Sequence, residues 1–157
     1  MWNIRDIVPE DVDLICAHRH AMFAASGKPR EVELAQMAAP FREWLVPKLS
    51  DGSYFGFVTE FENVPIASIG LMKIEWPPHP LHPTSDYRGY VLNMFVEPEF
   101  RKRGIARNLL DLSDAAFAER NIQYAVLHAT SMGRSLYEKN GWAPAPEMAK
   151  IINPAQA

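Results

Sequence analysis

Sulfur chemistry is nearly absent from this sequence. Cys16 is the only cysteine among 157 residues, so the chain can form no internal disulfide and no metal site built from several cysteines. Because Cys16 falls on the apolar stripe of an expected helix, we expect it to fill space in the core rather than to carry an acyl group. A disulfide-stabilised scaffold and a multi-cysteine zinc site are therefore excluded.

Long apolar runs and an excess of positive charge are also missing. No run of about 18 apolar residues occurs, and the N-terminal stretch "MWNIRDIVPEDVD" is polar and acidic rather than signal-like. We therefore expect a cytoplasmic protein with no membrane partner. The formal net charge is -3 at pH 7, whereas nucleic-acid binding depends on a basic surface. No nucleic-acid partner is expected, although a local basic site for one small anion stays open.

The common nucleotide and metal motifs are missing too. Neither the G-x-x-x-x-G-K-[ST] of a P-loop nor the G-x-G-x-x-G of a dinucleotide fold occurs. His79 and His82 are three residues apart, but prolines interrupt them and no third ligand is evident. His18 and His20 are two apart on an expected helix and therefore do not share a face. We expect no metal site.

What is present is the composition of an ordinary globular protein. Hydrophobic residues make up 48% of the chain and charged residues 22%, without internal repeats or low-complexity segments. A chain of 157 residues can bury one sizeable core but is too short for two ordinary domains. We predict a single domain over residues 1–157.

Hydrophobic periodicity predicts the elements of this domain. Alternating and continuous apolar runs predict strands over residues 2–8, 52–61, 64–76, 90–96, 124–129 and 147–152. Apolar residues at three- and four-residue steps predict helices between Pro9 and Gly27, within 30–46, from 105 to about 120, and over 133–140. The turn Glu62-Asn63 is expected to join the second and third strands into a β-hairpin. The predicted order is β-α-α-β-β-β-α-β-α-β.

Prolines mark two breaks in this pattern. Pro40 should kink or divide the second helix. The stretch "PPHPLHPTSDY" loses backbone donors at its prolines, which predicts a loop of about a dozen residues before the strand 90–96. Loops of this length are usually functional, so we expect this one to shape a binding pocket.

A basic, glycine-containing stretch opens the third predicted helix. The sequence "EPEFRKRGIARNLL", residues 97–110, places Arg101, Lys102 and Arg103 at the positive end of a helix dipole, which favours anions. Backbone N–H groups are free at a helix start, and Gly104 has no Cβ to keep a bulky anion from the main chain. Arginine offers forked donors that match phosphate oxygens. By residue types alone, two interpretations stay open: a phosphate site, or a solvated basic turn before an ordinary amphipathic helix.

This stretch, together with "LYEKNGW" downstream, resembles the GNAT superfamily of N-acetyltransferases. The family motif R/Q-x-x-G-x-G/A, which follows a strand ending in valine, is matched by Arg101, Gly104 and Ala106 after "NMFVEPEF". The predicted element order agrees with the family along nearly the whole chain. The resemblance implies an α/β fold with a mixed, mostly antiparallel central sheet flanked by helices, and acetyl-CoA as cofactor.

The resemblance also implies where coenzyme A would bind. Phe95 and Val96 would present backbone groups to the pantetheine arm, while residues 101–107 would surround the pyrophosphate. Ser131 and Arg134 are further candidate contacts near the last helix. The implied cofactor residues are Phe95, Val96, Arg101, Lys102, Arg103, Gly104, Ile105, Ala106, Arg107, Ser131 and Arg134.

One tyrosine is a candidate catalytic residue. Tyr137 lies in "SLYEKNGW", which resembles the L-Y-x-K-x-G-F segment of the family, where the tyrosine often sits near the thioester sulfur. A phenol with a pKa of about 10 could protonate the departing thiolate. The alternative is that Tyr137 packs its ring and forms a structural hydrogen bond.

The acceptor side offers no obvious general base. Some relatives have a glutamate on the central strand, but "YVLNMFV" contains no carboxylate and Tyr90 stands at approximately that position. Asn93 is a polar residue in an apolar strand and needs partners, so it is either a structural hydrogen-bonding residue or a substrate contact. His79 and His82 of the proline-rich loop could act as base or contact the substrate; the alternative is that both are simply solvated.

The predicted function is transfer of an acetyl group from acetyl-CoA to a primary amine by direct attack in a ternary complex. The acceptor would be a small-molecule or peptide amine, bordered by the first two helices as is common in the family, where His18 or His20 could line it. A homodimer stays open. The alternative from another class is a catalytically silent acyl-CoA sensor, and thiol release in the presence of amines would separate the two.

Overall fold

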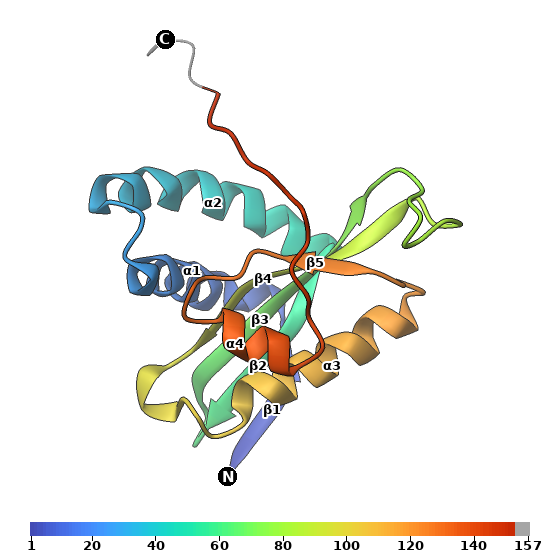
Figure 1. Ribbon diagram of the computed structural model, residues 1–157. Coiled ribbons are helices and arrows are strands. Elements are labelled where there is room, and N and C mark those ends of the chain that lie inside the picture. The colour runs from blue at the N-terminus through green and yellow to red at the C-terminus, as the bar shows by residue number, and fades with distance from the viewer. Residues whose placement is uncertain (153–157) are drawn as a thin grey trace.

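The computed structural model describes residues 1–152. Its strands are β1 (Trp2–Asp6), β2 (Tyr54–Phe61), β3 (Val64–Glu75), β4 (Tyr87–Val96) and β5 (Ala125–Leu127). Its α-helices are α1 (Val12–Ser26), α2 (Glu31–Asp51), α3 (Ile105–Glu119) and α4 (Arg134–Lys139), and short 3₁₀ turns lie at Pro9–Asp11 and Pro98–Phe100. Figure 1 shows the arrangement of these elements.

One sheet organises the molecule. Its strand order is β1-β2-β3-β4-β5; the first four strands are antiparallel, and β5 runs parallel to β4. Helices α1 and α2 cover one face of the sheet and α3 covers the other (Figure 1). Because β4 is an interior strand with helices on both sides, its sequence is almost continuously apolar. The mixed, mostly antiparallel sheet predicted from the sequence is confirmed.

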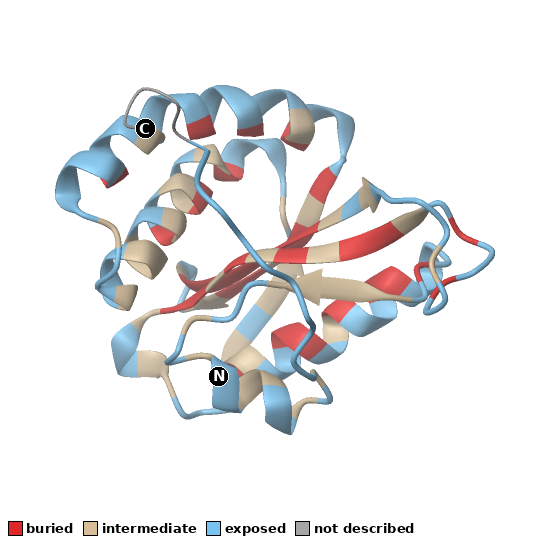
Figure 2. Ribbon diagram, turned by 45° about the horizontal axis from the view of Figure 1, so that its top comes forward, coloured by how far each residue is buried: buried red, intermediate tan, exposed pale blue. Residues whose placement is uncertain are grey.

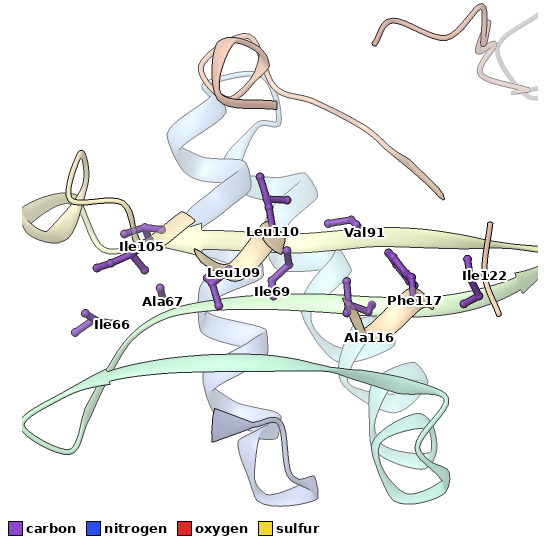
Figure 3. Close-up of a cluster of buried hydrophobic side chains, with 12 residues drawn as sticks. Ile66, Ala67, Ile69, Val91, Ile105, Leu109, Leu110, Ala116, Phe117 and Ile122 are labelled. Carbon is purple, nitrogen blue, oxygen red and sulfur yellow. The ribbon is translucent and has the colours of Figure 1, made fainter. Parts of the chain in front are cut away.

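Each face of the sheet has its own hydrophobic cluster. On the α3 face, residues from β3 and β4 pack against Ile105, Leu109, Leu110, Ala116 and Phe117 of the helix (Figure 3). On the other face, α1 and α2 bury Ile15, Phe41, Leu45 and Leu49 against Tyr54 of β2, and Cys16 packs at the edge of this cluster. The sheet is therefore held between two layers, and the α1–α2 layer is the one that later borders the candidate site.

Two turns show how local sequence sets the connections. Glu62 and Asn63 both have positive φ, 51° and 65°, as the two central residues of a tight hairpin turn require. In contrast, α2 runs through Pro40 and Pro47 without a break, so the expectation that Pro40 might divide this helix is wrong. Both prolines are exposed, so water can bond the carbonyls that lose a helical partner, and the buried apolar face holds the helix together.

The strand predicted over residues 147–152 is the main difference from the expected element order. Residues 143–152 have no regular structure and are exposed (Figure 2), including Met148 at 95% and Ile151 at 89%. Strand β5 contains only three residues, so its outer edge is too short to pair with another strand, and two prolines precede the segment. None of the helices within residues 1–152 has the length and hydrophobicity that crossing a membrane requires.

Candidate functional site

A cleft opens where β4 and β5 part. The two strands pair only between Gly89–Val91 and Ala125–Leu127, while β4 continues to Val96. Within residues 1–152, no strand therefore pairs with this edge of β4 from Leu92 onward. A pocket of about 520 Å³ lies at the separation.

Three parts of the chain line this pocket, which we call the cleft pocket. They are β4 from Tyr90 to Met94, the residues 128–131 after β5 with Tyr137, and residues of α1 with the turn after it. Of the site residues predicted from sequence, the cleft pocket brings together Tyr90, Asn93, Ser131 and Tyr137. The other predicted cofactor and substrate residues lie outside its lining.

A β-bulge shapes the β4 side of the cleft. Ser68 of β3 faces Phe95 and Gly70 faces Leu92, so two residues of β4, Asn93 and Met94, oppose the single residue between them on β3. Asn93 takes a positive φ of 55°, which asparagine tolerates better than most residues. The bulge breaks the regular alternation of β4 just where the strand loses its partner.

The side chain of Asn93 is held by two polar partners. Its Nδ2 donates to the Tyr54 hydroxyl at 3.0 Å, and its Oδ1 accepts from Nη1 of Arg19 at 2.6 Å. Asn93 is 3% exposed, so these bonds satisfy a buried amide. Gly70 of β3 makes the arrangement fit, because a Cβ there would overlap the Tyr54 hydroxyl. The structure favours the first of the two interpretations of Asn93, a structural hydrogen-bonding residue.

Arg19 lines the cleft pocket and was not among the site residues predicted from the sequence. It projects from α1 into the lining of the cleft pocket, whereas neither His18 nor His20 lines it. The available signal was its position, since Arg19 is a cation on the apolar stripe of an amphipathic helix. Its neighbour His18 is 3% exposed and its Nδ1 lies 2.7 Å from the Ser68 hydroxyl. Burial lowers the pKa of His18 to about 4.

The loop between β4 and α3, residues 97–104, leaves the start of α3 open. The first helical hydrogen bond runs from Asn108 N to the Gly104 carbonyl, and no side chain caps the helix. The N–H groups of residues 105–107 therefore point out of the helix end. Gly104 has a φ of 84°, which L side chains rarely adopt, and a Cβ built there would meet no atom within 4 Å. Glycine here serves the backbone conformation and keeps the approach to the amides open.

The cations of this loop have different surroundings. Nε of Arg101 donates to the Val96 carbonyl at 2.8 Å, and its guanidinium lies 5.5 Å from the centroid of the Phe95 ring. Arg101 therefore fastens the end of β4, with Phe95 and Val96 buried beneath. The remaining predicted phosphate-binding cations, Lys102, Arg103 and Arg107, are exposed.

Tyr137 of α4 faces the cleft pocket. Its half-buried ring packs edge-on against Trp142, with 6.2 Å between centroids, and burial raises the pKa of the phenol to about 12. Within residues 1–152 its hydroxyl has no hydrogen-bond partner, which leaves it available to a ligand. Ser131 also lines the pocket, whereas Arg134 is bonded to Glu138 at 2.9 Å on the exposed face of α4.

A chain of three polar groups crosses from β4 to the C-terminal segment. The Tyr90 hydroxyl is hydrogen-bonded to Nδ1 of His128, and Nε2 of His128 lies 3.4 Å from Oε1 of Glu147. Tyr90 and His128 both line the cleft pocket. Burial raises the pKa of Tyr90, with a smaller contribution from the Glu147 charge. The contacts between Tyr90, His128 and Glu147 were not predicted from the sequence, because Glu147 was expected in a strand.

The proline-rich loop holds its histidines away from the cleft pocket. His82 is fully buried; its Nδ1 lies 3.0 Å from the Ser85 carbonyl and its Nε2 accepts from Arg88. The His79 ring stacks on His82 with 5.6 Å between centroids. These contacts give His82 a structural role in closing the loop. Among residues 1–152, no three His, Cys, Asp or Glu side chains are grouped so that they could hold a metal ion.

Comparisons with known proteins identify relatives of this chain. A sequence model of the acetyltransferase (GNAT) domain matches residues 52–144. The GCN5-related N-acetyltransferase from Ralstonia eutropha JMP134 is 51% identical, with a TM-score of 0.95, covering 97% of this chain and 99% of that one. None of the curated proteins matches the chain in sequence.

Two further solved structures are more distant. A predicted acetyltransferase from Clostridium acetobutylicum, crystallised with acetyl-CoA, is 27% identical, with a TM-score of 0.86 and coverage of 100% of this chain and 99% of that one. The ribosomal-protein-alanine N-acetyltransferase from Brucella melitensis biovar Abortus 2308 is 20% identical, with a TM-score of 0.67 and coverage of 98% and 99%. At that identity the likeness concerns the fold alone.

Proposed function

The chain belongs to the GNAT family of acetyltransferases, and on that premise we propose that it moves the acetyl group of acetyl-CoA to a primary amine by direct attack in a ternary complex. The observation that carries this proposal is the unpaired edge of β4 from Leu92 onward, which lines the cleft pocket together with Tyr137. The same strand leads into the loop before the uncapped start of α3.

The backbone of the chain supplies the proposed cofactor contacts. The unpaired edge of β4 beyond Leu92 offers amide and carbonyl groups to the pantetheine arm, as a neighbouring strand would. The N–H groups of residues 105–107 face the direction from which a pyrophosphate would approach the helix dipole. The Clostridium relative crystallised with acetyl-CoA supports this cofactor. Exposed Lys102, Arg103 and Arg107 add positive charge around the phosphates.

Tyr137 is the proposed general acid. Its raised pKa of about 12 keeps the phenol protonated throughout the physiological pH range. The amine nitrogen bonds to the thioester carbon and the carbon–sulfur bond breaks. The departing sulfur then takes the phenolic proton and leaves as the thiol, and Tyr137 regains a proton from water. Its hydroxyl is free for this contact because no residue within 1–152 occupies it.

Tyr90 and His128 form the proposed route for the proton that leaves the amine. As the new carbon–nitrogen bond forms, the Tyr90 oxygen accepts this proton while its own passes to Nδ1 of His128. The resulting imidazolium faces Glu147 at 3.4 Å, which favours its charge.

Two measurements test this function in sequence. Calorimetry with acetyl-CoA at low ionic strength should show binding that weakens with salt, because the cations at the start of α3 are exposed. Free thiol release should then appear when a panel of amines is added. Binding without thiol release from any amine would favour the acyl-CoA sensor, and no binding at all would remove the proposal.

A further inference from the structure

Arg19 is a half-buried cation whose guanidinium lies close to two aromatic rings. Its guanidinium carbon lies 4.4 Å from the centroid of the Phe41 ring and 4.9 Å from that of Phe23. These contacts bring α1 and α2 together around the charge. Removal from water disfavours a charged group unless another charge or strong hydrogen bonds replace the solvent, and burial lowers the pKa of Arg19 accordingly.

The partners of Arg19 within the protein do not replace that solvent. The only hydrogen bond of its guanidinium within residues 1–152 goes to the neutral amide oxygen of Asn93, and its Nε is buried without a partner. No carboxylate forms an ion pair with Arg19 in this part of the chain. Arg88 also has no carboxylate partner within residues 1–152, but its Nε and Nη2 both contact His82. It lines neither the cleft pocket nor the pocket beside α2. Arg19 therefore has unused donors.

These donors lie at the junction of two pockets. Arg19 and Leu92 line both the cleft pocket and a second pocket of about 600 Å³, which we call the helix pocket. The helix pocket is bordered by α2, with Met37, Phe41 and Trp44 among its apolar lining residues. A ligand in the helix pocket can thus meet Arg19 and still extend along β4 toward Tyr90 and Tyr137.

The remaining charges of the two pockets do not neutralise Arg19. Glu33 is the only carboxylate among the residues that line them, and both of its oxygens are bonded to Arg30, one to the guanidinium at 2.9 Å and one to the backbone N–H at 3.0 Å. Lys28 adds a second cation to the cleft pocket. The pockets together therefore carry positive charge that a ligand can complement.

We propose that the acceptor amine carries an anionic group, a carboxylate or a phosphate, that binds the Arg19 guanidinium while the amine reaches the cleft pocket. This inference rests on the proposed N-acetyl transfer and specifies its substrate class. A guanidinium offers forked donors that match two oxygens of either group, and such charge-assisted bonds are strongest where water is excluded. Asn93 and Tyr54 act as positioning residues, because their hydrogen bonds fix the direction of Arg19.

Matched pairs of acceptors test the proposal with the unaltered protein. Apolar amino acids are compared with the amines that result from their decarboxylation, phenylalanine with phenethylamine being one pair, and O-phosphoethanolamine is compared with ethanolamine. In at least one of the two series, kcat/KM from thiol release should be about 10- to 100-fold higher for the anionic member, as expected for a hydrogen bond between charged groups. The series that shows the preference distinguishes carboxylate from phosphate. Equal or better turnover of the members without the anionic group, in both series, would overturn the proposal.

A variant and a matched control locate the preference at Arg19. R19Q should raise KM for acceptors with the anionic group by about 10-fold or more, because the lost contact is to the anion. It should have little effect on KM for amines without that group or on acetyl-CoA affinity. R42Q removes the same charge from the exposed surface of α2, where Arg42 pairs with Asp13, and should leave all these values unchanged.

The outcomes separate this inference from the reaction on which it rests. An equal loss with both members of a pair in R19Q would mean that Arg19 only supports the fold, and would overturn the inference while leaving N-acetyl transfer intact. If thermal unfolding shows that R19Q is not folded, the comparison of acceptor pairs with the wild-type protein still tests the inference. Absence of turnover with every amine would instead overturn the transfer reaction, and the inference with it.

Discussion

The two ends of the cleft are built in opposite ways. The proposed cofactor end comes from one continuous stretch, residues 95–107, and offers mainly backbone groups beside exposed cations. The proposed acceptor end comes from α1, α2, β2 and β4, and joins side chains that are distant in sequence, with half-buried Arg19 bonded to buried Asn93 and Asn93 bonded to buried Tyr54. A site made of backbone needs only the right local conformation, whereas a site made of distant side chains depends on how the layers pack.

This difference also separates what each end can recognise. Backbone N–H groups at a helix start bind any phosphate of suitable shape, so the cofactor end fits a cofactor that a whole family shares. A half-buried guanidinium close to Phe23 and Phe41 would select by charge and shape together. We therefore expect acceptor specificity at the end of the cleft where packing sets the geometry.

The largest expected effect is the loss of acetyl-CoA affinity in G104V, a change confined to the proposed cofactor end. G104V should weaken acetyl-CoA binding by about 10³-fold, because a side chain at positive φ shifts the loop and covers the amides, and each lost charge-assisted hydrogen bond is worth about 2 kcal/mol. R103A, which removes one exposed cation, should have a much smaller effect. Calorimetry measures both. Similar affinities for G104V and the wild type would mean that the backbone of this loop does not contact the cofactor.

The next largest effect is a pH dependence of stability caused by His18, which packs α1 against the end of β4. His18 lies between Ser68 and the Phe95 ring, and its pKa of about 4 is below the ordinary 6.5. Between these values the unfolded chain binds a proton that the native protein does not, so the free energy of unfolding should fall as pH decreases from 6.5 to 4. The loss of unfolding free energy due to His18 should reach about 3 kcal/mol near pH 4 and be absent above pH 6.5.

Denaturant unfolding across this pH range, in the wild type and in H18Q, measures the contribution. Other titrating groups cancel in the difference between the two proteins. Glu97, with its carboxylate 3.8 Å from Nε2, favours the charged imidazole, but its side chain is 40% exposed and solvent screens it, so burial dominates. If H18Q lost stability with acid as steeply as the wild type, the buried neutral histidine would not be the cause.

The centre of the cleft, between the two ends, should respond to Y137F. This change keeps the ring and its contact with Trp142 but removes the proton available to the sulfur. The chemical step should slow by about 10²-fold, within the usual range for general acid catalysis. Acetyl-CoA affinity should hardly change. Single-turnover measurement is required, because slow product release can hide a slower chemical step; an unchanged rate would make Tyr137 structural.

The smallest expected effect comes from H128Q, which tests the proposed proton route on the acceptor side of the cleft. H128Q retains a polar group beside Tyr90 but cannot hold the proton, so we expect kcat/KM to fall by about 10-fold or more near neutral pH and to recover as the pH rises and more of the amine becomes neutral. E147Q should give a weaker change in the same direction, since the carboxylate acts only through His128. A pH profile identical to that of the wild type would exclude the Tyr90–His128 route.

Much of the fold was predictable because its signals are local. The Glu62-Asn63 turn, the helix start at Gly104 and the apolar run of β4 each follow from residues adjacent in sequence. The final strand was predicted wrongly for the complementary reason. A strand needs a partner edge, and the shortness of β5 is a property of the sheet rather than of residues 147–152.

The sequence by itself determined most of the elements, the basic, glycine-containing start of α3 and the family to which the chain belongs, since all of these depend on short-range backbone preferences and spacing. Only the tertiary structure decided that Arg19 meets Asn93, that His128 lies between Tyr90 and Glu147, and that His82 is buried within its own loop. Each of these contacts except the last joins residues from different elements. Their geometry is set by packing energy summed over both faces of the sheet, which no local pattern records.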